Sequence, residues 1–243
     1  MTDLPVPVLQ HPHWRVNFRP SEYDGNLIPT LANCFEIVER NKVSLRGWDF
    51  PHLSRRDEER AHGNNWIASW SQFAGHYEYW RLYQSGQFIY LGAVREVTEA
   101  EWKKQLETIT KSHLSHMRDI AWEAIPGFIS MVNFVYNVTE IYEFAARLCQ
   151  TQLYSGSLNI KIELKGIKGF VLSAPWDRVW YSYYSATEDY LATTKEIATD
   201  TLIASSKQEA LNTIAWFFER FGWLNPPVET FARDQEKLLS GRF

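Results

Sequence analysis

The chain has 243 residues, of which 45% are hydrophobic and 22% are charged, a composition typical of a folded soluble protein. Its formal net charge of −4 argues against a general electrostatic attraction to nucleic acid, but it leaves room for a local basic patch. The chain has no apolar run near the roughly 20 residues of a membrane span, and no signal-peptide pattern at its start, so we expect a cytoplasmic protein.

The first half of the chain alternates between strand and helix patterns. Residues 14–18 alternate apolar and polar side chains and predict a strand, and residues 43–45 predict another. Between them, apolar side chains from Leu27 to Val38 recur at helical spacing and predict a helix. Residues 66–70 alternate again, which predicts a third strand.

A bend containing glycine and proline follows residues 43–45 and carries the densest group of chemically active side chains in the first half. We take Arg46, Trp48, Asp49 and His52 as candidate ligand-binding residues. An Arg46–Asp49 pair beside an imidazole can hold a phosphate or orient a water molecule. The alternative is an ion pair that only fixes the loop, with His52 exposed.

Residues 76–94 predict a hairpin around which the first half is organised, with Ser85-Gly86 as a two-residue tip. The register of such a tip pairs Arg81 with Tyr90 and puts Tyr83 on the same face. We take these three residues as a second candidate ligand-binding surface, because rings around a cation can stack on a flat ligand. Core packing is the alternative role for the rings.

A boundary between two halves is predicted at Pro126-Gly127. Before it, residues 98–101 match a capping box that opens a helix over residues 102–117. That helix carries two histidines, which would need remote partners to hold a metal ion. The predicted organisation is therefore an N-terminal half at residues 1–126 and a C-terminal half at residues 127–243.

The second half repeats the order of the first. Residues 128–136 predict a buried strand, Asn137 is expected to cap a helix, and residues 158–165 alternate as a half-buried strand. The repeated order of strand, helix and strand predicts two βαβ-like halves. The expected fold class is α+β, with antiparallel or mixed sheets covered by helices.

The remaining elements are predicted from weaker patterns. Residues 177–184 predict an aromatic strand, and residues 190–197 a short helix. Residues 206–209 match a second capping box, whose helix is expected to end at Gly222. An amphipathic helix within residues 229–243 could then pack on the chain itself or on another chain.

The chain contains no complete catalytic motif, since a nucleophile elbow, a P-loop and a dinucleotide-binding glycine pattern are all absent. We therefore assign no catalytic residue, metal ligand or cofactor. Glu163-Leu164-Lys165 is similar to the second half of the restriction-type nuclease motif, with Glu140 on a helix as the upstream acid. Cys34 and Cys149 lie in apolar patterns and are expected to be buried free thiols.

Three lysines near a glycine bend form a candidate nucleic-acid-binding site: Lys161, Lys165 and Lys168. Flat bases could stack on the aromatic face that carries Arg81, with a cation–π contribution from the guanidinium group. The alternative is that the lysines only solvate a strand edge and prevent edge-to-edge aggregation.

Residues 46–52 (RGWDFPH) together with residues 79–88 (YWRLYQSGQF) resemble an uncharacterised bacterial module. That module accompanies Schlafen/AlbA-type domains, which are classed as DNA-binding and recur among regulatory and anti-phage proteins. The resemblance covers mainly residues 14–97 and, more faintly, residues 128–172. It implies a regulatory or defence setting and supplies no catalytic residues.

Our functional hypothesis is a non-enzymatic binding or sensor module that recognises a nucleotide, a nucleic acid or a protein partner, in a bacterial regulatory or anti-phage defence protein. The first alternative is a metal-dependent nuclease that uses Glu140, Glu163 and Lys165. The second is a structural subunit of a complex or homo-oligomer, with the C-terminal helix as its interface.

Overall fold

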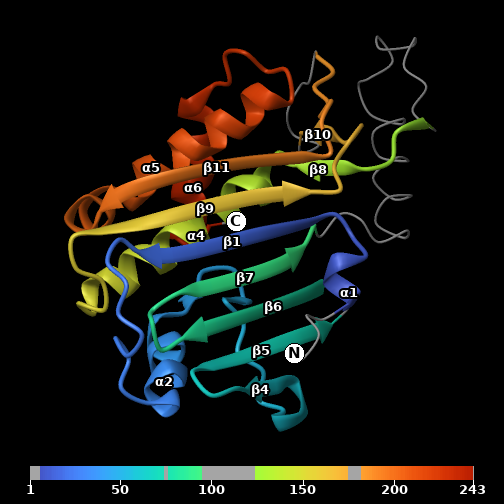
Figure 1. Ribbon diagram of the computed structural model, residues 1–243. Coiled ribbons are helices and arrows are strands. Elements are labelled where there is room, and N and C mark those ends of the chain that lie inside the picture. Colours follow the sequence, from blue (N-terminus) through green and yellow to red (C-terminus); the bar gives the residue numbers. More distant parts are fainter. Residues whose placement is uncertain (1–5, 74–75, 95–123, 175–181, 243) are drawn as a thin grey trace.

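The computed structural model describes residues 6–73, 76–94, 124–174 and 182–242. It confirms the α+β class, because a large antiparallel sheet packs against helices (Figure 1). The predicted helix at residues 102–117 and most of the predicted strand at 177–184 lie outside the described residues. The described helices are α1 (Val6–Leu9), α2 (Leu31–Asn41), α4 (Met131–Gln150), α5 (Thr199–Arg220) and α6 (Val228–Leu239), with a short 3-10 helix at Asp57–Glu59.

Seven strands form the main sheet, and every neighbouring pair in it is antiparallel. Their order across the sheet is β11 (Tyr190–Ala198), β9 (Ser157–Lys165), β1 (His13–Pro20), β7 (Phe88–Ala93), β6 (His76–Tyr83), β5 (Trp66–Phe73) and β4 (Arg60–His62). Two small sheets complete the described strands: β2 (Val43–Ser44) pairs with β3 (Asp49–Phe50), and β8 (Phe128–Ser130) pairs with β10 (Val171–Ser173).

Strand β1 joins the two predicted halves. It pairs with β7 of the first half on one side and with β9 of the second half on the other, so the halves share one sheet. The order of strand, helix and strand occurs in both halves, as β1-α2-β2 and β8-α4-β9. However, β2 and β8 lie outside the seven-stranded sheet, so neither unit forms a βαβ pairing within it.

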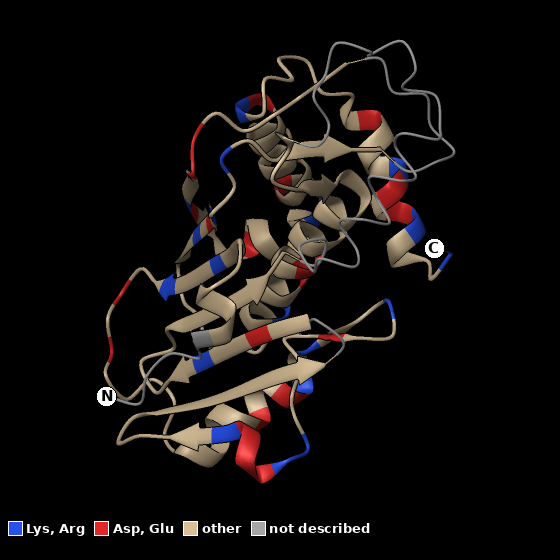
Figure 2. Cartoon of the chain, turned by 90° about the vertical axis from the view of Figure 1, so that its right-hand side faces the viewer, with Lys and Arg blue, Asp and Glu red and all other residues tan. Residues whose placement is uncertain are grey.

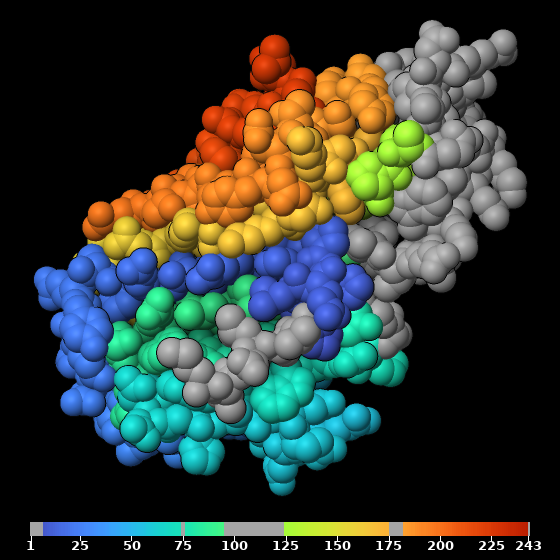
Figure 3. Space-filling view, turned by 45° about the vertical axis from the view of Figure 1, so that its right-hand side comes forward, coloured from blue at the N-terminus to red at the C-terminus, as the bar shows by residue number. Residues whose placement is uncertain are grey.

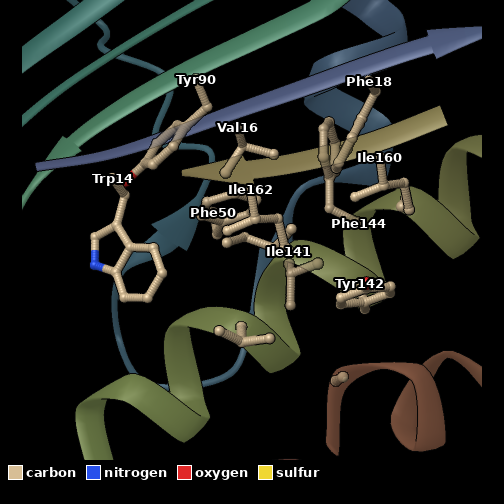
Figure 4. Close-up of a cluster of buried hydrophobic side chains, with 14 of the residues drawn as sticks. Trp14, Val16, Phe18, Phe50, Tyr90, Ile141, Tyr142, Phe144, Ile160 and Ile162 are labelled. Carbon is tan, nitrogen blue, oxygen red and sulfur yellow. The ribbon is translucent and has the colours of Figure 1, made fainter. Parts of the chain in front are cut away.

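The main core lies between the sheet and the helices behind it. Period-two alternation on β1 turns Trp14, Val16 and Phe18 towards the helices, where all three are buried. Figure 4 shows these side chains facing Ile141 and Phe144 of α4. Burying apolar side chains from both layers supplies the main driving force for this packing.

The long helix α4 corrects the prediction of a strand over residues 128–136. The strand β8 has only three residues, and the helix starts at Met131, after Ser130, whose hydroxyl accepts from the backbone N–H of Asn133 at 3.3 Å. Asn137 therefore lies inside the helix instead of capping it. Apolar side chains predominate over residues 131–138 at the start of α4, and such a short apolar run does not distinguish a buried helix from a buried strand.

The hairpin of β6 and β7 has a longer loop than predicted. The Tyr83 N–H donates to the Gln87 carbonyl oxygen at 2.9 Å, and Gly86 has a φ of +78°. These features describe a three-residue loop with glycine in the left-handed region. The extra residue shifts the register by one, so Arg81 pairs with Ile89, and the predicted pairing of Arg81 with Tyr90 is wrong.

Two predictions near the C-terminus are wrong. Residues 190–197 belong to strand β11, which pairs with β9 along its whole length, so tertiary pairing outweighs the weak helical spacing. The second capping box is not formed, because the Ser206 hydroxyl donates to Glu143 Oε1 at 2.6 Å. The helix predicted after it is the second part of α5, which begins at Thr199 but is kinked at Ser205, where the backbone is non-helical with a φ of −140°.

Other C-terminal and side-chain predictions are confirmed. Gly222 follows α5 with a φ of +90°, and its N–H donates to the Glu219 carbonyl oxygen at 3.0 Å, as expected of a helix C-terminus. Phe231 of α6 is buried against the same chain, and Cys34 and Cys149 are buried free thiols. None of the helices in the described ranges combines the length and apolar character that crossing a membrane requires.

Candidate functional site

The predicted ligand-binding residues lie on two opposite faces of the main sheet. Along β6, Glu78, Trp80 and Leu82 point towards the helices, and the intervening residues point the other way. We call the second side the open face; it consists of the strand side chains that point away from α2, α4 and α5. Figure 3 shows strands of the open face side by side, with the residues around α1 over one part of it. Two sites therefore have to be considered.

Arg81 is the centre of an aromatic cluster on the open face. Its guanidinium group lies 3.9 Å from the centroid of the Trp66 ring and donates to the Tyr79 and Tyr83 hydroxyls at 2.6 and 3.1 Å. Tyr79 is buried beneath Val8 of α1, whereas Arg81, Tyr83 and Trp66 stay half-buried. The cluster is therefore partly accessible, and its cation is already held by its own rings.

The strand register places two of the three predicted lysines on the same face as Arg81. Arg81 pairs with Ile89, Ile89 pairs with Asn17, and Asn17 pairs with Lys161, which forms one row across four strands. At the usual strand spacing, Arg81 and Lys161 are roughly 14 Å apart at the backbone. Lys165 lies farther along β9, with its ammonium group 5.2 Å from the centroid of the Tyr190 ring.

Lys168 differs from the other two lysines. It is exposed in the loop between β9 and β10, and its backbone N–H faces the Asp189 carboxylate at 3.4 Å. It therefore belongs to no row of the sheet.

By the strand registers, the charged side chains of the open face are mostly basic. They are Arg15, Arg19, Arg81, Lys161 and Lys165, against Glu163 and Glu196. Figure 2 marks the acidic and basic residues along the whole chain. Among the described residues, no carboxylate lies within ion-pair distance of Arg19, Arg81 or Lys165. This basic excess contrasts with the net charge of −4 for the whole chain.

Glu163 neutralises part of this basic group. Its carboxylate lies 3.5 Å from Arg15 and 3.1 Å from Lys161, and it accepts from the Tyr190 hydroxyl at 2.5 Å. Burial acts to raise the pKa of Glu163, but the hydrogen bonds and the two cations outweigh burial and hold the pKa below its usual value.

The acids of the nuclease alternative are not brought together. Glu163 lies on the open face, whereas Glu140 lies on α4 behind the sheet and pairs with Arg46. The sheet separates the two carboxylates, so they cannot share a metal ion. In the described ranges, no three His, Cys, Asp or Glu side chains gather closely enough to hold one.

A cavity of about 290 Å³ lies on the other side of the sheet, between the strands and α4. Four of the predicted ligand-binding residues line it: Arg46, Trp48, Asp49 and Tyr90. His52 stacks on the Trp48 ring, with the ring centroids 4.1 Å apart. Tyr90 reaches the cavity, and not the open face, because of the shifted hairpin register.

Arg46 does not pair with Asp49 as predicted. Its Nε donates to Glu140 Oε1 at 3.1 Å, its Nη2 donates to Glu140 Oε2 at 2.7 Å, and Asn137 accepts a further bond. Asp49 instead pairs with Lys42 at 2.7 Å. Burial acts to raise the pKa of Asp49, but the Lys42 and Ser44 hydrogen bonds prevail and lower it.

Glu78 is the buried carboxylate of the cavity that the sequence interpretation missed. Its side chain is 1% exposed, and it accepts from the His52 backbone N–H at 2.9 Å and from the Tyr90 hydroxyl at 3.2 Å. His76 Nε2 lies 3.2 Å from the same carboxylate. Burial, with Glu78 next to it, raises the pKa of Tyr90, so the phenol keeps its proton and donates it.

One signal in the sequence could have identified Glu78. It occupies a core-facing position of an alternating strand, two residues before Trp80 and four before Leu82. A charged residue at such a position is either paired or functional. Glu140 gave no comparable signal, because its partner Arg46 is 94 positions away in the chain.

Comparisons of the chain with protein-family models, with curated proteins and with solved structures found no match. The resemblance to the bacterial module associated with Schlafen/AlbA-type domains therefore stays a prediction.

Proposed function

We propose that the protein is a non-enzymatic binding module that holds single-stranded nucleic acid on its open face. The observation that carries the proposal is the row of the sheet that places Arg81 and Lys161 on one face, within a group of mainly basic side chains. The proposal includes the cytoplasmic, bacterial regulatory or anti-phage setting that the resemblance implies.

The basic side chains of the open face suit a phosphate backbone. Arg19 and Lys165 have no carboxylate partner among the described residues, so their charges are available to phosphates. The rest of the chain is acidic overall and repels the same polyanion, which favours binding at this face over others.

The aromatic cluster favours single strands over duplexes. Trp66, Tyr83 and the plane of the Arg81 guanidinium group offer surfaces on which an unstacked base can lie. The bases of a duplex are stacked on one another and cannot use such surfaces. A sheet face with both rings and cations therefore fits a flexible single-stranded nucleic acid, with its phosphates near β9 and its bases near β6.

The test is fluorescence anisotropy with a labelled 12-nucleotide single strand, measured over a series of salt concentrations. We expect Arg81→Ala to weaken binding by about 1–3 kcal/mol through lost stacking. Lys165→Ala, which removes a lysine without a carboxylate partner among the described residues, should weaken binding less and reduce the salt slope by about 0.7, the value for one phosphate contact with a single strand.

Arg220→Ala provides a matched control. Arg220 lies 4.1 Å from the centroid of the Trp216 ring, so it is also an arginine stacked on a tryptophan, but it belongs to α5 and not to the open face. It should leave binding unchanged. The proposal is wrong if wild-type protein gives no salt-dependent binding, or if Arg220→Ala and Arg81→Ala have equal effects.

A further inference from the structure

Of the carboxylates that line the cavity behind the sheet, Glu78 lacks a permanent cationic partner in the part of the chain that the structure describes. Asp49 and Glu140 also line the cavity, but Lys42 pairs with the first and Arg46 with the second. Among the described residues, Glu78 meets only neutral donors and His76, which is charged only when protonated. A buried charge without a counter-charge is costly, so this site favours an added positive charge.

Among the described residues, Arg46 is the one permanent cation that lines the cavity, and its hydrogen-bonding groups are already in use. Its guanidinium group donates to both oxygens of Glu140 and to Asn137. A bound phosphate or carboxylate would have to compete with Glu140 for Arg46 and would also face Glu78. The cavity therefore disfavours anions, in contrast to the open face.

The remaining lining is suited to an apolar body. Figure 4 shows Trp14, Phe50, Tyr90 and Ile141 at one end of the core, and all four line the cavity. The indole N–H of Trp48 is buried and has no hydrogen-bond partner within the described ranges, so the wall also offers a donor. A cavity of about 290 Å³ lies at the lower end of the usual size range of ligand pockets and fits a metabolite-sized molecule.

We propose that this cavity is a second binding site, which takes a small organic cation: an amine, amidine or guanidine attached to an apolar or aromatic group. The cationic nitrogen lies against Glu78, and the apolar part lies against Trp14, Phe50 and Ile141. This site goes beyond the proposed function, because it lies on the opposite face of the sheet and selects the opposite charge.

The test compares three probes of nearly equal size and shape: benzamidine, benzamide and benzoate, which are cationic, neutral and anionic. Binding to the wild-type protein is measured by isothermal titration calorimetry and by ligand-detected NMR. We expect the affinity for benzamidine to be roughly 10-fold or more above that for benzamide, because a hydrogen bond between charged groups contributes more binding free energy than a neutral one. Benzoate should bind most weakly.

Two variants assign the charge preference to Glu78. Glu78→Gln keeps the shape of the side chain and removes its charge, so benzamidine should lose its advantage over benzamide. Glu143→Gln is the control, because Glu143 follows Glu140 on α4 but bonds to Ser206 and does not line the cavity. It should keep the wild-type order of affinities.

The proposal is overturned if benzamide or benzoate binds to the wild-type protein as tightly as benzamidine, or if none of the three binds. It is also overturned if a folded Glu78→Gln variant keeps the preference for benzamidine. The comparison of the three probes uses only wild-type protein. It therefore still tests the proposal if the Glu78→Gln protein fails to fold. Oligonucleotide binding on the open face is measured separately, so either proposal can fail without the other.

Discussion

The two faces of strand β6 show how differently adjacent residues of one strand are used. Trp80 faces the helices, is fully buried, and donates from its indole nitrogen to the His52 carbonyl oxygen at 2.8 Å. Arg81, the next residue, is half-buried among rings on the open face. The helix face fixes each side chain by packing, whereas the open face leaves charged groups near solvent. We therefore expect stability to depend mainly on the first face and nucleic-acid binding on the second.

The largest expected difference in stability is between variants of these two adjacent residues. Trp80→Ala should lower the free energy of unfolding by about 3–5 kcal/mol, because it leaves a cavity in the core. Arg81→Ala should cost only about 1 kcal/mol, from lost cation–π contacts at a partly exposed site. Urea denaturation of both variants measures the difference. Equal losses would mean that the open face is as much a part of the core as the helix face.

A smaller effect compares one tyrosine hydroxyl between the helices with one on the open face. Tyr142 lies under α5, with its hydroxyl 2.8 Å from the Thr213 hydroxyl, and both groups are buried. Tyr142→Phe should cost about 1–2 kcal/mol, because it leaves Thr213 without this partner. Tyr190→Phe removes an exposed donor to Glu163 and should cost less than about 1 kcal/mol. Thermal unfolding of both variants makes the comparison, and a larger loss for Tyr190→Phe would contradict it.

The smallest expected effect is the dependence of stability on pH that Glu163 causes. The pKa of Glu163 is lowered in the folded protein, so its carboxylate stabilises the fold at pH values above the usual value of 4.5. This stabilisation is lost as the pH falls from 4.5 through the folded-state pKa. Urea unfolding midpoints measured from about pH 6 to pH 3 should therefore fall more steeply for the wild type than for Glu163→Gln. Parallel curves would show that the Glu163 cluster adds no acid-dependent stability.

The sequence predicted those elements in which one face is clearly apolar. The alternation from Trp14 to Phe18 is sufficient to identify β1, and Phe231 and Leu238 identify the buried side of α6. It did not predict the start of α4, because the short apolar run at residues 128–136 fits a buried strand as well as a buried helix. Local patterns also carry no information about which strands pair across long stretches of chain.

The candidate sites were predicted only in part, for two physical reasons. The hairpin register depends on one residue of loop length, which moved Tyr90 from the open face to the cavity. The partner of Arg46 depends on the packing of α4 against the loop before β3, which placed Glu140 nearer than Asp49. Arg81 shares a face with Tyr83, and Lys161 shares a face with Lys165, because strands alternate, and alternation can be read from the sequence. Only the pairing of the strands puts both pairs on the same face.

The central position of β1 has a consequence for synthesis of the chain. Its partner β9 is made long after it, since His13 pairs with Lys165. Until the ribosome has released residues 157–165, the nascent sheet ends at β1, whose unpaired N–H and C=O groups can template association with another chain. The edge of β1 therefore stays unpaired until β9 has been synthesised. Aggregation during expression should fall when translation beyond residue 94 is fast relative to collisions between nascent chains.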